Sequence, residues 1–167
     1  MADALPRALH ILGAVLWLGP QFFMFIAVMP ALRAAGDTAR MRAMAVLTVR
    51  FNYLAWGALA LLVLTGLYAV GDRAADFDLF DVRYGSILVV KVAFAAAAIL
   101  LTALHSFVIG PRLLALQEVA ATGGGVEPER IAALRRRSML ISIATLLLGL
   151  AIVYMGALLR QTEFSLT

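Results

Sequence analysis

The sequence predicts an all-α protein, an integral membrane four-helix bundle whose helices run alternately up and down. Two observations lead to this prediction. Of the 167 residues, 63% are hydrophobic and 14% are charged, whereas soluble domains carry about 25% charged residues. The hydrophobic residues also gather in four runs, and each run reaches the roughly 20 residues that a helix needs to cross a bilayer. Consecutive spans joined in this way pack antiparallel.

The chain is expected to form a single transmembrane domain, residues 1–167, with spans at about 8–32, 51–71, 84–112 and 137–160. The first run is longer than the apolar part of a signal peptide and has no small-residue cleavage site after it, so we expect it to remain as the first helix. Gly19-Pro20 falls near the middle of this span. Because proline removes a backbone hydrogen bond, we expect a kink there.

The connections predict the direction of the helices. Residues 33–50 carry four arginines, and residues 111–138 carry Arg112, Arg130 and the run 135–137. The connection 72–83 instead carries four aspartates against two arginines. Since basic loops stay in the cytoplasm, we expect a multi-pass protein of the bacterial inner (plasma) membrane with both termini on the outer side. These arginines indicate topology and contact with the lipid bilayer, and no nucleic-acid partner is expected.

Three ionisable residues inside the apolar runs are the candidate functional groups. Lys91 is the only lysine of the chain and lies within the third span. A charge at membrane depth costs at least about 3 kcal/mol and usually faces a partner or a cavity. His10 lies in the first span and His105 further along the third. The absence of cysteine excludes disulfides and thiolate ligands for a metal or a haem.

Depth decides which of these groups can meet. The first and third spans run in the same direction, so His10 and Lys91 are expected at similar depth near the outer side. His105 follows Lys91 by about four turns, roughly 20 Å deeper at 1.5 Å per residue. One iron or copper ion could therefore be bound by His10 with Lys91, but not by His10 with His105 of the same subunit.

Helical periodicity places the unusual residues of each span on one stripe, which we expect to face the interior of the bundle. The small residues between Lys91 and His105 leave room either for close helix packing or for a flat macrocycle. The first stripe comprises His10, Ala14, Trp17, Gln21, Met24 and Val28, and the second comprises Lys91, Ala95, Ala98, Thr102 and His105.

Each candidate also has an ordinary structural interpretation. His10 can be an interfacial histidine, Lys91 can extend its ammonium group to the outer surface, and His105 can hydrogen-bond a neighbouring helix. Trp17 is a residue that more often packs in a core than forms the wall of a cofactor site. The methionines are scattered along the sequence without the tight clusters of a copper relay, so most are expected to pack in the core.

Three segments resemble the copper resistance D superfamily of four-span membrane proteins. ALHILGAVLWLG, followed by Pro30-Ala-Leu, resembles its opening helix. RFNYLAWGALALLVLTGLY resembles its second helix, and YGSILVVKVAFA resembles its third, where Tyr-Gly precedes an intramembrane lysine. The resemblance covers about residues 8–115. It implies a four-span bundle and, by the name of the superfamily, copper handling.

The same outline is similar to the J-type bacterial protoporphyrinogen oxidases, which are four-span haem-b proteins. Their first helix has a histidine seven positions before a tryptophan, matching His10 and Trp17. Their third helix has a lysine and a later histidine, matching Lys91 and His105. The chain departs from them at FFMFIAVMPALR, where that family has a Leu-Pro-Arg-Leu stretch, and its lysine-to-histidine spacing is about one turn longer.

Three functions follow as hypotheses. The first is a membrane protein that binds haem b, possessing a redox or porphyrin-handling role as an oxidoreductase, with a quinone or porphyrin as substrate. In it His10 ligates iron, Lys91 is the second ligand or pairs with a propionate, Trp17 and Gln21 line the pocket, and His105 holds a further group. The second is a copper uptake or resistance transporter in which His10, His105 and Met155, with Met24 and Met29, bind copper. The third is a cofactor-free membrane partner subunit, and a homo-oligomer is compatible with each.

Overall fold

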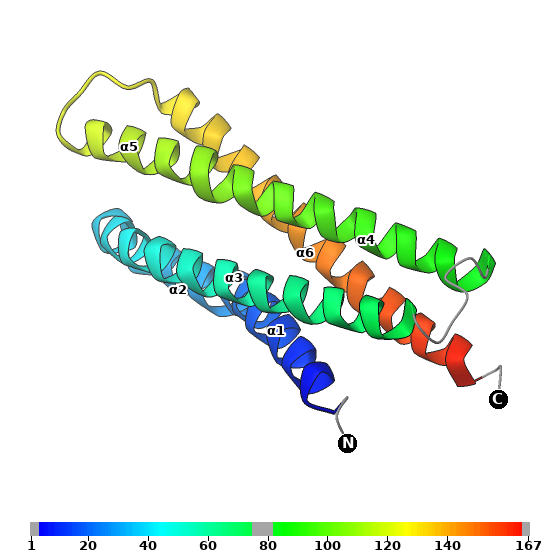
Figure 1. Cartoon of the computed structure of the whole chain (residues 1–167). Coiled ribbons are helices and arrows are strands. Elements are labelled where there is room, and N and C mark those ends of the chain that lie inside the picture. The colour runs from blue at the N-terminus through cyan, green and yellow to red at the C-terminus, as the bar shows by residue number, and fades with distance from the viewer. Residues whose placement is uncertain (1–3, 75–81, 165–167) are drawn as a thin grey trace.

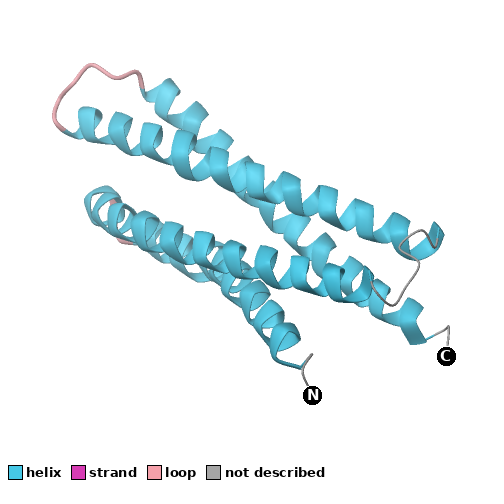
Figure 2. Cartoon of the chain, viewed as in Figure 1, coloured by secondary structure: helices cyan, strands magenta, loops and turns pink. Residues whose placement is uncertain are grey.

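The computed structural model describes residues 4–74 and 82–164, and this part of the chain is helical apart from two short connections. Its helices form four long rods that lie along one another as a bundle (Figure 1, Figure 2). Four segments are long and apolar enough to cross a membrane, namely Ala4–Ala34, Ala39–Gly71, Gly85–Ala121 and Pro128–Leu159. The predicted all-α four-helix membrane bundle is confirmed.

The first and third rods are each built from three pieces. The first consists of α1 (Ala4–Phe23), a π-helical segment η1 (Met24–Val28) and α2 (Met29–Ala34). The third consists of α4 (Val82–Ala103), a second π-helical segment η2 (Leu104–Ile109) and α5 (Gly110–Ala121). The second and fourth rods are the uninterrupted helices α3 (Asp37–Ala74) and α6 (Pro128–Phe164).

Both π-helical segments stand directly before a proline. Pro30 and Pro111 lack an amide hydrogen, and the ring of a proline collides with the carbonyl four residues earlier in a regular α-helix. In each rod a backbone hydrogen bond instead spans five residues rather than four. The Met29 amide donates to the Met24 carbonyl, and the Gly110 amide donates to the His105 carbonyl. At Gly19-Pro20, where a kink is expected, α1 continues through Pro20 to Phe23, so this proline does not end the helix.

The helices extend well beyond the predicted spans. The segments expected as long inner connections, residues 33–50 and 111–138, are mostly helical, and the actual connections are residues 35–36 and 122–127. Each begins at a helix end with a glycine at positive φ, Gly36 at 84° and Gly123 at 83°, a conformation that glycine adopts without a steric cost. The acidic outer connection falls mainly on residues 75–81, which lie outside the described residues.

The bundle is assembled from two helix pairs. The densest packing joins α1 to α3 and α4 to α6, while contacts between the two pairs are few. The buried core is small and comes from three rods: Trp17, Ala58, Leu59 and Ala98. Most large apolar side chains elsewhere on the helices are exposed, as expected for surfaces that face lipid.

The two pairs repeat one another in detail. Each contains a rod interrupted by a π-helical segment and a proline, followed by an unbroken helix, and the interrupted rods run in the same direction (Figure 1). Corresponding residues of the two interrupted rods are separated by a constant offset in sequence. His10, Trp17, Gln21, Met24 and Pro30 correspond in this order to Lys91, Ala98, Thr102, His105 and Pro111.

Candidate functional site: an interior cavity and a second polar cluster

A cavity of about 500 Å³ lies in the half of the bundle that carries the connections 35–36 and 122–127. All four rods contribute to its walls, and both π-helical segments face it through Met24 and Phe25 on one side and through His105 and Ser106 on the other. Because π-helical segments occur frequently at functional sites, their meeting at one cavity singles out this region of the bundle.

Methionine is the most unusual component of the cavity wall. Five of the seven methionines of the chain line it, from three of the four rods. Thioether sulfur is a soft ligand that favours Cu(I), and the same side chains also fill irregular space in cores. The sequence alone did not reveal this gathering, because these residues are far apart in the chain. They are Met24, Met29, Met41, Met44 and Met139.

His105 is the titratable residue of the cavity that can act as a ligand. Its Nε2 lies 2.9 Å from the Ser138 hydroxyl of α6, so one ring nitrogen is occupied by a hydrogen bond and the ring is oriented across two rods. Such a second partner fixes the orientation of a histidine that binds a metal. Gly110 belongs to this arrangement, because a Cβ there would lie 3.0 Å from the His105 carbonyl oxygen.

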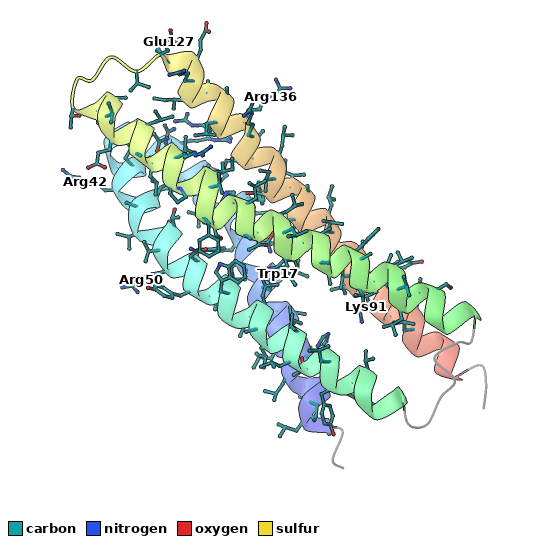
Figure 3. The ribbon with its side chains drawn as sticks, turned by 45° about the horizontal axis from the view of Figure 1, so that its top comes forward. Trp17, Arg42, Arg50, Lys91, Glu127 and Arg136 are labelled. Atoms are coloured by element: carbon teal, nitrogen blue, oxygen red, sulfur yellow. The ribbon has the colours of Figure 1, made fainter. Side chains whose placement is uncertain are left out.

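The rest of the cavity wall has two parts, namely uncharged side chains inside the bundle and arginines at the end near the connections. Trp17 is 5% exposed and forms part of the wall, and Figure 3 shows its ring inside the bundle. Gln21 also lines the cavity and donates a hydrogen bond to the Trp17 carbonyl at 2.9 Å. Arg33, Arg40 and Arg135 lie toward the connections, and the described lining contains no carboxylate.

The second polar group of the bundle lies near its opposite end and centres on His10. The Nδ1 of His10 is 2.8 Å from the Thr65 hydroxyl oxygen. This hydroxyl has one proton, which it donates to the Leu61 carbonyl at 2.6 Å. Thr65 therefore accepts from His10, so the ring carries its proton on Nδ1 and presents Nε2 as a lone pair. An imidazole in this tautomer is ready to act as a ligand.

Lys91 lies near this group on α4. Its ammonium nitrogen is 3.5 Å from the position that a Cβ on Gly156 of α6 would occupy, and Figure 3 shows the residue on the side of α4 next to α6.

The predicted site residues consequently fall into two groups. His10, beside Thr65, and Lys91, beside Gly156, lie outside the cavity. Trp17 and Gln21, expected around His10, line the cavity together with His105, and so do Met24 and Met29. None of the residues in the two predicted stripes is exposed. Each stripe has one histidine or lysine outside the cavity, His10 or Lys91, and other residues that line the cavity. Of the three expected copper ligands His10, His105 and Met155, only His105 lines the cavity.

Several residues of both sites were not identified from the sequence. Met41 and Met44 were assigned to a connection, although their spacing puts them on one face of a helix. Thr65 and Ser138 hold the two histidines from another rod, a relation that only the three-dimensional packing reveals. Among the described residues no three His, Cys, Asp or Glu side chains come together in a possible metal site, so a metal in the cavity would depend on thioethers.

Comparison with known proteins gives one result. The sequence profile of the family described as copper resistance protein D matches residues 44–159. This segment includes α4, α5, most of α3 and most of α6, and hence Thr65, Lys91, His105 and Ser138. No curated protein and no solved structure matches the chain.

Proposed function

The chain belongs to the copper resistance protein D family, and from this premise we propose that it is a membrane protein that handles copper ions, with the interior cavity as its Cu(I) site. The observation that carries the proposal is the gathering of five methionines and His105 around one cavity. Thioether and imidazole groups together form a ligand set suited to Cu(I). The proposal assigns copper as cargo and gives no catalytic role to any residue.

The charges of the cavity wall suit a copper ion that has to be released as well as bound. The described wall offers neutral donors and no carboxylate, and its end carries Arg33, Arg40 and Arg135. Thioethers therefore supply the attraction for the cation, while the guanidinium groups of Arg33 and Arg135 oppose it. Because attraction by the thioethers is partly offset by repulsion from the guanidinium groups, the affinity for Cu(I) is moderate, and the ion can dissociate from one methionine and bind another. His105 is the strongest single donor, and Ser138 orients it.

The experiment is a measurement of Cu(I) affinity on the purified full chain, by competition with a chromophoric Cu(I) chelator under reducing conditions. Met41→Leu/Met44→Leu conserves volume and apolarity and removes two sulfurs, so it is expected to weaken Cu(I) binding at least tenfold. His105→Phe should weaken it by a similar factor. Met155→Leu is the matched control, since Met155 does not line the cavity, and should leave the affinity within twofold. Equal affinities in all four proteins would contradict the proposal.

Haem b is a second candidate, and the specific observation in its favour is the tautomer of His10. The Nε2 lone pair of His10 could serve as an axial ligand, with Lys91 as the second ligand or as the partner of a propionate. Bound haem would supply one-electron redox chemistry. Against this, Trp17 and Gln21, the expected walls of such a pocket, surround a different cavity.

The absorbance spectrum of the purified protein, together with its copper content, distinguishes the two candidates. A Soret band that His10→Ala abolishes would favour haem, whereas copper without a Soret band favours the cavity proposal. If haem is present, Lys91→Met should reduce its content. Lys91→Arg would then restore an ion pair but not a ligand, because arginine stays charged.

A further inference from the structure

A second basic site lies between α5 and α6, outside the cavity assigned to copper. It is an open groove of about 690 Å³ whose described lining consists of three arginines and four small or apolar residues. The arginines are Arg112 from α5 and Arg130 and Arg137 from α6. The floor is formed by Ala115 and Leu116 from α5 and by Ala133 and Leu134 from α6.

Helical spacing explains why these residues converge. Arg112, Ala115 and Leu116 are one stripe of α5, because positions three and four apart share a face. Arg130, Ala133, Leu134 and Arg137 form the corresponding stripe of α6 over two turns. The two stripes face each other across the groove, so the apolar residues form a common floor and guanidinium groups flank it from both helices.

The groove lies at the boundary between the apolar spans and the polar end of the bundle. Arg112 is the first charged residue after Lys91, and Arg137 directly precedes the uncharged run 138–159. The two arginines therefore mark the level at which a bilayer changes from acyl chains to headgroups. Arg130 lies two turns farther out on α6, roughly 10 Å at 1.5 Å per residue.

We propose that this groove binds the headgroup of an anionic phospholipid. Arg112 and Arg137 hold the phosphate, Arg130 adds positive charge at the far end of the groove, the headgroup lies over the alanine and leucine floor, and the acyl chains run from Arg112 and Arg137 along the apolar spans. The chemistry supports this occupant, because arginine binds phosphate oxygens with two parallel hydrogen bonds. The described lining contains no carboxylate that would neutralise the three guanidinium groups. Basic pockets between transmembrane helices on the cytoplasmic side bind anionic headgroups in this way.

The test compares lipid retention by the full chain, purified in detergent and supplied with phosphatidylglycerol or with phosphatidylcholine of the same acyl chains. Retention is measured by native mass spectrometry. The wild-type protein is expected to retain at least fivefold more phosphatidylglycerol than phosphatidylcholine. Arg112→Gln/Arg137→Gln should abolish this preference. Arg136→Gln is the matched control and should retain it, because Arg136 points away from the groove (Figure 3).

Two further measurements make the result decisive. Ala133→Trp fills the floor without changing any charge, and it should reduce retention of phosphatidylglycerol while circular dichroism remains that of the wild type. Inorganic phosphate at millimolar concentration should leave the bound lipid in place. The proposal is overturned by equal retention of the two lipids, by an equal effect of Arg136→Gln, by an unaffected Ala133→Trp protein, or by full displacement with inorganic phosphate.

Discussion

At the scale of single residues, hydroxyl groups on neighbouring helices hold both histidines of the bundle. Thr65 accepts a hydrogen bond from His10, and Ser138 pairs with His105. The sequence predicted the histidines because ionisable groups are rare within apolar runs. It could not predict their partners, which lie 55 and 33 residues away, because threonine and serine in a transmembrane helix most often bond their own backbone.

The His10–Thr65 bond has a measurable effect on stability. Thr65→Val keeps the shape of the side chain but removes the acceptor, so the His10 ring loses its partner in the bundle. We expect the free energy of unfolding to fall by about 1–2 kcal/mol, the cost of leaving such a group unsatisfied. The measurement is unfolding of the purified protein in increasing denaturing detergent. Thr65→Ser keeps the hydroxyl and should restore most of the loss; a Thr65→Val protein as stable as the wild type would contradict the assignment.

The methionines of the cavity could not be predicted as a cluster from the sequence. Each is an ordinary apolar residue in its own segment, and their spacing along the chain shows no cluster. The cavity gathers them only because three rods converge on it. A ligand set drawn from several helices is thus invisible to periodicity, which compares residues of a single helix.

At the scale of elements, glycines decide where two helices approach most closely. A Cβ on Gly149 of α6 would lie 2.5 Å from Leu18 Cδ2 and 2.9 Å from Trp17 Cζ3 of α1. Gly57 of α3 has nothing within 4 Å of the same position. A small residue where two helices approach closely, as at Gly149, is typical of helix packing in membranes.

These two glycines form a matched pair of substitutions. Gly149→Leu is expected to lower the stability by about 1–3 kcal/mol, the usual cost of overpacking, and to disturb the wall of the cavity near Trp17. Gly57→Leu adds the same side chain at an exposed position and should be neutral or stabilise the helix by up to about 1 kcal/mol. Thermal unfolding followed by circular dichroism measures both. Equal losses in the two proteins would show that α1 and α6 do not approach at Gly149.

The ends of the helices were predicted less well than their centres. Hydropathy locates the part of a helix that lies in lipid, and it carries no signal for a helix that continues into water. Residues 37–50 and 128–136 are rich in arginine and were assigned to connections, although arginine and alanine both favour helix. The structure shows them as the first turns of α3 and α6.

At the scale of the whole molecule, the arrangement of the arginines predicts the orientation in the membrane. Both connections of the described structure, residues 35–36 and 122–127, are at the end of the bundle that carries the arginine-rich turns. Basic segments remain in the cytoplasm, so a reporter active only outside the cytoplasm should give a signal when fused after Thr167. The same reporter inserted at Gly124 should be silent. The reverse pattern would show that the bundle lies the other way round.

The correspondence between the two interrupted rods also shows where the two halves of the bundle differ. His10 corresponds to Lys91, Met24 to His105 and Pro30 to Pro111. One rod therefore offers an imidazole where the other offers an ammonium group, and a thioether where the other offers an imidazole. A dimer of two identical hairpins would carry the same residue at both members of each pair. A single chain with two different hairpins can therefore build asymmetric sites that no such dimer can form.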